Sequence, residues 1–302
     1  MPVAVRSEKV RELVDENAEV EQVATGFTFT EGPIWMSDGS LHFSDMPGDK
    51  RRRWHPDEGV SVLLELSRKC NGMTRDNDGN VIVCEHVTSS VVRESPDGRR
   101  DTLAYHWGDK YLNSPNDVIV ASDGSIIFTD PTYGRMPGFG IERAQELDFQ
   151  GVYRIPPGGG TEDLQLLVDD FKQPNGLCFS PDESKLYIAE VGNTPRVVRV
   201  YDVVDHGTRL ANKRTHIDCG QGTVDGFRCD VDGNLWCGWG MGTDDLDGVM
   251  VFNPAGKPIG RIALPERCAN LCFGGTARNR LFMAASQSVY SLYVATQGVA
   301  GG

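Results

Sequence analysis

The sequence predicts an all-β fold, a six-bladed β-propeller built from four-stranded antiparallel blades. Three observations predict it: an internal repeat that occurs six times, a turn signal at a constant place in the repeat, and almost no helical periodicity. Because propellers of this size commonly fold as one unit, the 302 residues are expected to form a single domain, 1–302.

Six segments of the chain align, and each opens with a polar residue, called the anchor below. The anchors follow one another at spacings of 40, 45, 59, 50 and 45 residues. Seven residues after the anchor stands an Asp in five of the repeats, and in four of these Gly follows it, which is the Asp-Gly signal of a β-hairpin. The anchors are Glu31, Asn71, Asn116, Asn175, Asp225 and Asn270.

Each repeat divides into four short strands, which the third repeat shows most clearly. Its strands are expected at 117–122, 125–130, 151–156 and 163–168, and a Pro-Gly-rich turn separates the last two. A short helix is expected around 8–14.

The last repeat has only three clear strands, whereas a spare strand-like segment, 18–27, precedes the first repeat. The simplest closure pairs this segment into the last blade, because a propeller must protect its open strand edges. Removal of residues 1–25 is therefore expected to destabilise the ring.

Two insertions interrupt the repeat, at 105–114 and at 131–149. Long loops on a rigid scaffold often carry function. For the second half of the 131–149 segment, a loose surface excursion is an equally good interpretation.

The first strand of every blade lines the channel, so the six anchors are expected to form one ring of two carboxylates and four carboxamides. An all-oxygen ring suits hard divalent cations such as Ca²⁺, Mg²⁺ or Mn²⁺. The alternative is that these residues only cap turns, which we favour for Asn71 and Asn270. Glu31 is a poor turn residue and replaces Asn in the repeat, which indicates a need for charge.

A second acidic tier is expected at the same mouth, where the second strands end. Its members are Asp45, Glu85, Asp130 and Glu190, and in the fifth blade Trp239 takes this place. Such a tier would attract cations. Each acid taken singly is better interpreted as a hydrogen-bonding strand end than as a ligand.

Composition excludes several classes of function. A formal net charge of −13 disfavours nucleic-acid and anionic-membrane partners, which need a basic face. No run of 18 apolar residues occurs, and we expect a cytoplasmic protein. The eight Cys form no CxxC pair and those in apolar runs are expected to be buried. The six His show no metal-site spacing, and structural roles are expected for His42 and His86.

Four motifs carry a family resemblance: FTEGPIW (29–35), SPNDVIV (114–120), QPNGLCFSPD (173–182) and VDGFRCDVDGNLW (224–236). Together they resemble the gluconolactonase / regucalcin (senescence marker protein) / luciferin-regenerating enzyme family. The stretch FTDPTYG at 128–134 is similar to the bacterial gluconolactonase branch.

The resemblance implies a propeller with one divalent cation, which Glu31, Asn175 and Asp225 would bind. Ca²⁺ is favoured, with Zn²⁺, Mn²⁺ and Mg²⁺ as alternatives. It also implies that Asp225 is the acid/base residue and that Asn116 contacts the substrate. One departure stands out, since animal members have an arginine two residues before that asparagine and this chain has Ser114.

The function that follows is metal-dependent hydrolysis of sugar lactones such as gluconolactone, with the cation polarising the carbonyl and Asp225 as acid/base. Asp130 and Tyr133 are expected to contact the small-molecule substrate. One alternative is a phosphotriesterase or aryl-ester lactonase on the same metal site, and another is a non-enzymatic propeller that serves as a binding platform. The oligomeric state is left open.

Overall fold

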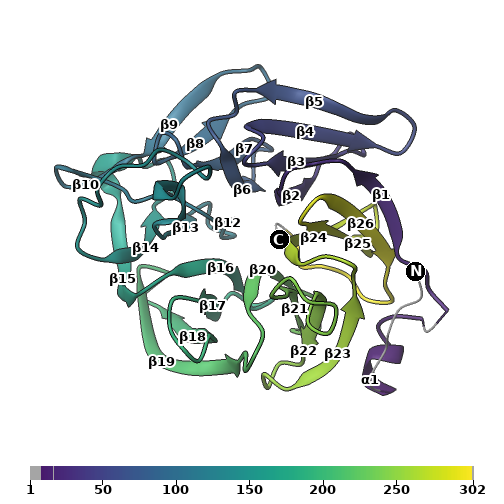
Figure 1. Cartoon of the computed structure of the whole chain (residues 1–302). Helices are drawn as coiled ribbons and strands as arrows, with labels where there is room; N and C mark the ends of the chain where they lie inside the picture. Colours follow the sequence, from purple (N-terminus) through teal and green to yellow (C-terminus); the bar gives the residue numbers. More distant parts are fainter. Residues whose placement is uncertain (1–7, 16, 301–302) are drawn as a thin grey trace.

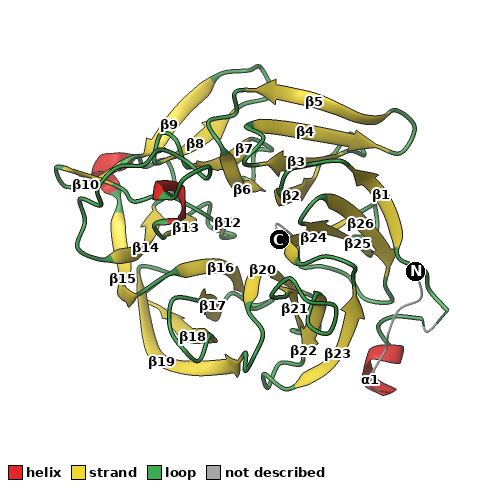
Figure 2. Cartoon of the chain, in the orientation of Figure 1, coloured by secondary structure: helices red, strands yellow, loops and turns green. Residues whose placement is uncertain are grey.

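The computed structural model describes residues 8–15 and 17–300. Six four-stranded antiparallel sheets stand as blades around a central channel (Figure 1), which confirms the six-bladed propeller. Helical structure is limited to short pieces (Figure 2): α1 (Glu8–Arg11), where the helix around 8–14 was expected, and the 3₁₀ turns η1 (Tyr133–Arg135) and η2 (Thr161–Asp163).

The blades follow the repeat in order, and the four expected strands of the third repeat are present. The strands of blades one to three are β2 (Thr30–Trp35), β3 (Leu41–Asp45), β4 (Lys50–His55), β5 (Gly59–Glu65), β6 (Cys70–Arg75), β7 (Val81–Glu85), β8 (Ser90–Glu94), β9 (Arg100–Ala104), β12 (Val118–Val120), β13 (Ile126–Asp130), β14 (Gln150–Ile155) and β15 (Gln165–Phe171). The strands of blades four to six are β16 (Pro174–Phe179), β17 (Lys185–Glu190), β18 (Val197–Val204), β19 (Arg209–Asp218), β20 (Val224–Cys229), β21 (Leu235–Trp239), β22 (Gly248–Phe252), β23 (Pro258–Ala263), β24 (Cys268–Gly274), β25 (Arg280–Ala285), β26 (Ser288–Tyr293) and β1 (Glu21–Thr25). The insertion at 105–114 forms a small hairpin of β10 (His106–Trp107) and β11 (Lys110–Tyr111).

The ring closes through the N-terminal strand. β1 pairs antiparallel with β26, with Glu21 opposite Ser291 and Thr25 opposite Ser288, so the sixth blade combines the two ends of the chain. The expected closure is confirmed. Since β1 is the outer strand of a blade whose other strands come from the C-terminal part, the contact joins residues more than 260 positions apart.

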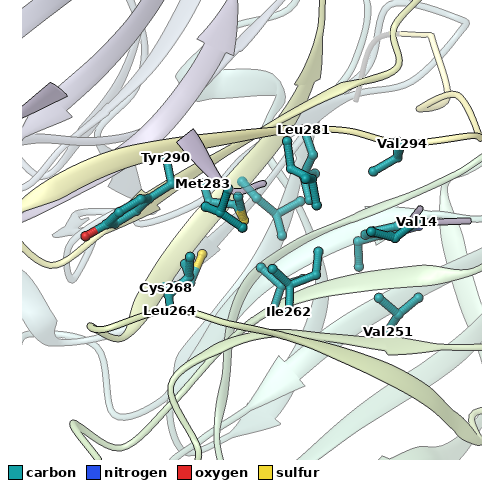
Figure 3. Packing of buried hydrophobic residues seen from close by; sticks show 14 of the residues in the cluster. Val14, Val251, Ile262, Leu264, Cys268, Leu281, Met283, Tyr290 and Val294 are labelled. Carbon is teal, nitrogen blue, oxygen red and sulfur yellow. The ribbon is translucent and has the colours of Figure 1, made fainter. Parts of the chain in front are cut away.

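The hydrophobic core is divided into six clusters, one between each pair of successive blades. Figure 3 shows the cluster between blades five and six, where Met283, Leu281 and Ile262 face one another. The segment that follows α1 joins this cluster through Val14, and Val10 of α1 packs directly on Gly260, where a Cβ atom would overlap its side chain. All eight Cys are buried and unbridged, which includes the four in apolar runs for which burial was expected, Cys84, Cys178, Cys237 and Cys272.

Two devices bring the anchors into the channel. In five inner strands the β-pairing register shifts beside the anchor, for example between Glu31 and Ile34, which is a bulge-like irregularity that turns a side chain off the sheet. In four blades Gly follows the anchor because the next blade comes too close for a side chain. A Cβ on Gly32 would overlap the carbonyl oxygen of Asn71, and one on Gly176 would overlap that of Asp225.

The channel end opposite the anchors is covered by the C-terminal segment. Val299 donates its backbone N–H to the carbonyl of Cys229 and packs near the ends of several inner strands. Between this cover and the anchors lie Asp117 and Arg228, a buried pair with 3.7 Å between Oδ2 and Nη1. One end of the channel is therefore filled, and the anchor end is left to form a pocket.

Candidate functional site

The six anchors meet at the floor of one pocket or directly beside it, and all are buried. Glu31, Asn71, Asn116, Asn175 and Asp225 line the pocket, which has a volume of about 330 Å³. The sixth, Asn270, lies behind this floor and donates from Nδ2 to Glu31 Oε2 at 3.0 Å. The proposed ligands Glu31, Asn175 and Asp225, which come from three different blades, are thus brought together with Asn116.

The carboxamides of three neighbouring blades form a directed chain of hydrogen bonds. Asn71 Nδ2 donates to Asn116 Oδ1 at 2.6 Å, and Asn116 Nδ2 donates to Asn175 Oδ1 at 2.8 Å. Asn175 Oδ1 accepts one hydrogen bond in this chain and keeps a second lone pair, because a carboxamide oxygen has two. The turn-capping interpretation of Asn71 is therefore wrong, since its side chain belongs to this network.

His86 starts this chain, although the sequence suggested only a structural role for it. Its Nδ1 lies 2.9 Å from the carbonyl oxygen of Phe139, in the 131–149 loop, and its Nε2 lies 3.2 Å from Asn71 Nδ2. Burial lowers the pKa of His86 to about 4, so the imidazole is neutral at neutral pH. Because a carbonyl oxygen can only accept, Nδ1 carries the proton and Nε2 accepts from Asn71.

Two carboxylates share this desolvated floor, and their ionisation is opposed. Burial, followed by the negative charges of Asp225 and Asp117, raises the pKa of Glu31 to about 8. Burial also raises the pKa of Asp225, while the guanidinium of Arg267 acts in the other direction. Arg267 opposes this effect at Asp225 and Arg228 opposes it at Asp117, and an added cation would further relieve the repulsion among these carboxylates and Glu31.

The donor set fits a hard divalent cation. It consists of two carboxylates and a carboxamide oxygen with a free lone pair, all on one pocket floor. Among residues 8–15 and 17–300 there is no group of three or more His, Cys, Asp or Glu that could hold a metal ion. A site here would therefore depend on Asn175 as well as on the two carboxylates, and would suit oxygen-seeking ions better than Zn²⁺.

Arg267 is a functional residue that the sequence did not reveal. It precedes β24, lines the pocket and forms an ion pair with Asp225 through Nη2, and its side chain is 33% exposed. Burial raises the pKa of Asp225, and this contact acts in the opposite direction by favouring the charged carboxylate. Arg267 lies three residues before its anchor, an offset that also holds Arg68 and Lys172, but of these three only Arg267 lines the pocket.

Of the two further residues expected to contact substrate, the structure places only one at the pocket. Tyr133, in η1, lines it, and burial raises the pKa of its hydroxyl. Asp130 lies behind the pocket wall and is fully buried, with its two carboxylate oxygens accepting from the backbone N–H groups of Asn113 and Ser114 at 2.8 Å. Asp130 therefore fixes the backbone just before Asn116, and we do not retain it as a substrate contact.

Ser114 also serves the loop rather than the pocket. Its hydroxyl donates to the carbonyl of Pro131 at 2.6 Å and accepts from the N–H of Gly134 at 2.9 Å. The residue that stands in place of an arginine thus fastens the start of the 131–149 loop, which supplies Tyr133 and Phe139 to the pocket wall.

The acids of the second tier hold the ends of their strands in place through hydrogen bonds and ion pairs. Asp45 accepts from the N–H of Thr28 at 2.9 Å, and Glu190 accepts from the N–H groups of Lys172 and Gln173 at 3.0 and 3.1 Å. Both acids also pair with arginines, as does Glu85 with Arg100. None of the four lines the pocket, so the single-residue interpretation is the right one.

In three blades, the residue that follows the acid of the second tier lines the pocket: Met46, His86 and Val191. This offset was available in the sequence, since each follows the acid that ends a second strand. Most of the remaining side chains of the pocket wall are apolar, and Arg196 and Arg267 are cationic.

Within the described ranges, no helix has the length and apolar character needed to cross a membrane.

The fold and floor define a class: a six-bladed propeller whose anchor-end pocket carries two carboxylates among carboxamides. A family profile described as "SMP-30/Gluconolactonase/LRE-like region" matches residues 29–287, and the chain belongs to this family. The resemblance carried by the four sequence motifs is confirmed.

Individual relatives agree with this placement. A gluconolactonase of Zymomonas mobilis is 31% identical over 316 residues, which cover 97% of this chain and 86% of that protein. The solved structure of a gluconolactonase from Xanthomonas campestris matches with a TM-score of 0.88 at 32% identity, covering 97% of this chain and 95% of that one. A calcium-binding regucalcin from Agrobacterium tumefaciens, 18% identical over 91% of this chain and 92% of its own, shares the fold with a TM-score of 0.73.

Proposed function

We propose that the protein is a divalent-metal-dependent lactonase, a carboxylic ester hydrolase that opens lactone rings. The observation that carries this proposal is the pair of buried carboxylates, Glu31 and Asp225, on a floor of ordered carboxamides. Relatives named gluconolactonase support the reaction class. A scaffold that only displayed a surface would gain nothing from two repelling carboxylates in a desolvated pocket.

Glu31, Asn175 and Asp225 would hold the cation, for which Ca²⁺ is our first candidate because all donors are oxygens. When bound, such an ion polarises the lactone carbonyl and stabilises the charge that develops on its oxygen. Glu31 contributes charge, and Asn175 contributes a neutral oxygen whose direction is set by the hydrogen bond from Asn116.

Asp225 would act as the acid/base residue. Its carboxylate takes a proton from the attacking water as the water oxygen bonds to the carbonyl carbon, and returns it to the ring oxygen when the carbon–oxygen bond breaks. Burial increases the proton affinity of Asp225, and the ion pair with Arg267 favours its charged form. Asn116, on the pocket floor, and Tyr133, on its wall, would orient the lactone.

The test is hydrolysis of D-glucono-1,5-lactone before and after chelation, with Ca²⁺, Mn²⁺, Mg²⁺ or Zn²⁺ added back. We expect chelation to abolish activity and at least one ion to restore it. Asp225→Asn keeps the size of the side chain and should lower kcat by about 100-fold or more, whereas Asp78→Asn, at an exposed turn, is the matched control.

Full activity of the chelated protein would refute the metal requirement, and full activity of Asp225→Asn would refute the acid/base assignment. Paraoxon assayed in parallel distinguishes a phosphotriesterase on the same floor. If neither lactones nor paraoxon are hydrolysed by the ion-loaded protein, the binding-platform interpretation gains support and the lactonase proposal fails.

A further inference from the structure

The pocket changes character above its polar floor. Besides the polar residues Tyr133, Arg196, Thr223 and Arg267, its wall carries six apolar side chains, called the apolar collar below: Phe29, Met46, Met136, Phe139, Val191 and Met241. Sugar lactones carry a hydroxyl on most ring carbons, and each hydroxyl that leaves water without a partner is unfavourable. The collar therefore bears directly on which lactones the site accepts.

Hydrogen bonds to the backbone hold part of the collar in position. Met46 and Val191 each follow an acid that ends a second strand, Asp45 and Glu190, and these acids are hydrogen-bonded to nearby backbone N–H groups. Asp45 also accepts from the N–H of Phe29 at 3.4 Å. Three of the six apolar side chains are thus held over the floor by buried carboxylates.

Two methionines at the mouth remain in contact with water. Met136 is 50% exposed and Met241 is 43% exposed, and they come from different blades. A single exposed apolar side chain is ordinary, but apolar side chains gathered around a concave site mark a place where apolar ligand surface is covered. Methionine is flexible and adapts to ligands of different shape.

The floor offers few partners to a polyhydroxylated ring. Asn71, Asn116 and Asn175 are hydrogen-bonded to one another, and Asn270 is bonded to Glu31. Asp225 is paired with Arg267. These groups are suited to hold an ion and one ester group, while the collar above them presents carbon and sulfur.

We infer that the physiological substrate class of this site is a lactone bearing an apolar alkyl or aryl substituent, with the ring ester at the floor and the substituent in the collar. This inference rests on the lactonase function proposed above and specifies it. Burial of a methylene favours binding enough to change an equilibrium by about fourfold, so each added methylene that enters the collar should raise kcat/KM by about that factor.

The experiment compares lactones that share one six-membered ring: δ-valerolactone, δ-hexalactone, δ-octalactone, δ-decalactone and D-glucono-1,5-lactone, with the ion-loaded full-length protein. We expect kcat/KM to rise along the alkyl series, mainly through KM, and to exceed the value for gluconolactone. A flat or falling series with gluconolactone preferred would overturn the inference and leave the lactonase proposal intact. No hydrolysis of any of the five would overturn both.

Substitutions in the collar test whether these side chains cause the preference for lactones with apolar substituents. Met136→Gln and Met241→Gln keep the length of the side chain and place an amide in the collar, so δ-decalactone should lose more kcat/KM than δ-valerolactone. The matched control is Ile141→Gln, in the same loop as Met136, exposed but outside the pocket, which should leave the ratio of the two substrates unchanged. An unaltered ratio in both methionine variants would refute the collar assignment.

Discussion

At the residue scale, the central feature is that Glu31 is held where its charge is disfavoured. Burial and the negative charges of Asp225 and Asp117 disfavour the ionised form of Glu31. A cation bound beside these carboxylates would offset their repulsion, so the arrangement favours cation binding. The same residue is the one that departs from Asn in the repeat. A cation bound in the pocket, as proposed above, would account for a carboxyl group at this position.

The first prediction concerns Glu31 and pH. Its pKa rises from an ordinary 4.5 to about 8 on folding, so between these values the ion-free native state binds more protons than the unfolded state. The stability that this group contributes is fully present below pH 4.5 and is lost as pH rises through about 8. We expect the Tm of chelated protein, measured by calorimetry, to fall over this window.

Glu31→Gln, which cannot ionise, should reduce this decline while weakening ion binding by about tenfold or more, since affinity follows the number of charged ligands. Saturating Ca²⁺ should reverse the decline in the parent protein. A pH slope that is identical in the parent and in Glu31→Gln would contradict the assignment.

His86 leads to the second prediction. Because it accepts from Asn71, it dictates which way the carboxamides of Asn71, Asn116 and Asn175 face. The cost is visible in Asn71 Oδ1, which has no hydrogen-bond partner in the part of the chain that the structure describes. Flipping Asn71 would not satisfy this oxygen, because it would then face two acceptors, His86 Nε2 and Asn116 Oδ1, and both bonds made by Nδ2 would be lost.

We expect ¹⁵N NMR of the imidazole to show a proton on Nδ1 and none on Nε2. His86→Phe should lower ion affinity by about tenfold, whereas His86→Gln retains an acceptor for Asn71 and should recover part of it. His216→Phe, a partly buried histidine on β19 far from the pocket, serves as control. A proton on Nε2, or unchanged ion affinity in His86→Phe, would remove the positioning role.

At the element scale, four of the six inner strands come close to the next blade at the residue that follows the anchor. Gly32, Gly72, Gly176 and Gly226 occupy this position, and a Cβ on any of them would overlap the neighbouring blade. The Gly of the Asn-Gly and Asp-Gly motifs therefore sets the spacing of the ring, while the anchor supplies its chemistry.

Gly176→Ala tests this spacing without a change of backbone conformation, since Gly176 is not in the left-handed region. Overlap with the carbonyl of Asp225 should reduce the free energy of unfolding by about 1–3 kcal/mol and disturb ion binding as well. Gly160→Ala, where a Cβ would make only an ordinary van der Waals contact with the carbonyl oxygen of Leu103 at 3.7 Å, is the control in the same denaturant titration. Equal stability of the two variants would show that the blades can separate without cost.

At the scale of the whole molecule, the propeller depends on a closure between chain ends. β1 completes the sixth blade, and α1 contributes Val10 to the core cluster between blades five and six. Without these segments, β26 would present an unpaired edge and the cluster would open to water.

Deletion of residues 1–25 should therefore lower Tm by several degrees or more and promote aggregation through the exposed edge of β26. A synthetic peptide of residues 8–27 added in trans should restore part of the lost stability, as measured by thermal shift. A truncated protein with the parent Tm would show that closure does not support the ring.

The sequence by itself determined the propeller, its closure and the identity of the floor. These follow from local and periodic signals: an anchor and an Asp-Gly turn repeat in order, and equivalent positions of a propeller must share one depth in the channel. Glu31, Asn116, Asn175 and Asp225 could be placed together for that reason.

Only the tertiary structure decided what surrounds the floor. Arg267 reaches Asp225, His86 orders the carboxamides, six apolar side chains form the collar, and Asp130 turns to the backbone behind the wall. These contacts join different blades through loops of unequal length, so they depend on the path of each loop. A periodic pattern specifies which residues are equivalent, as Met46, His86 and Val191 are, but it does not specify which partner each of them contacts.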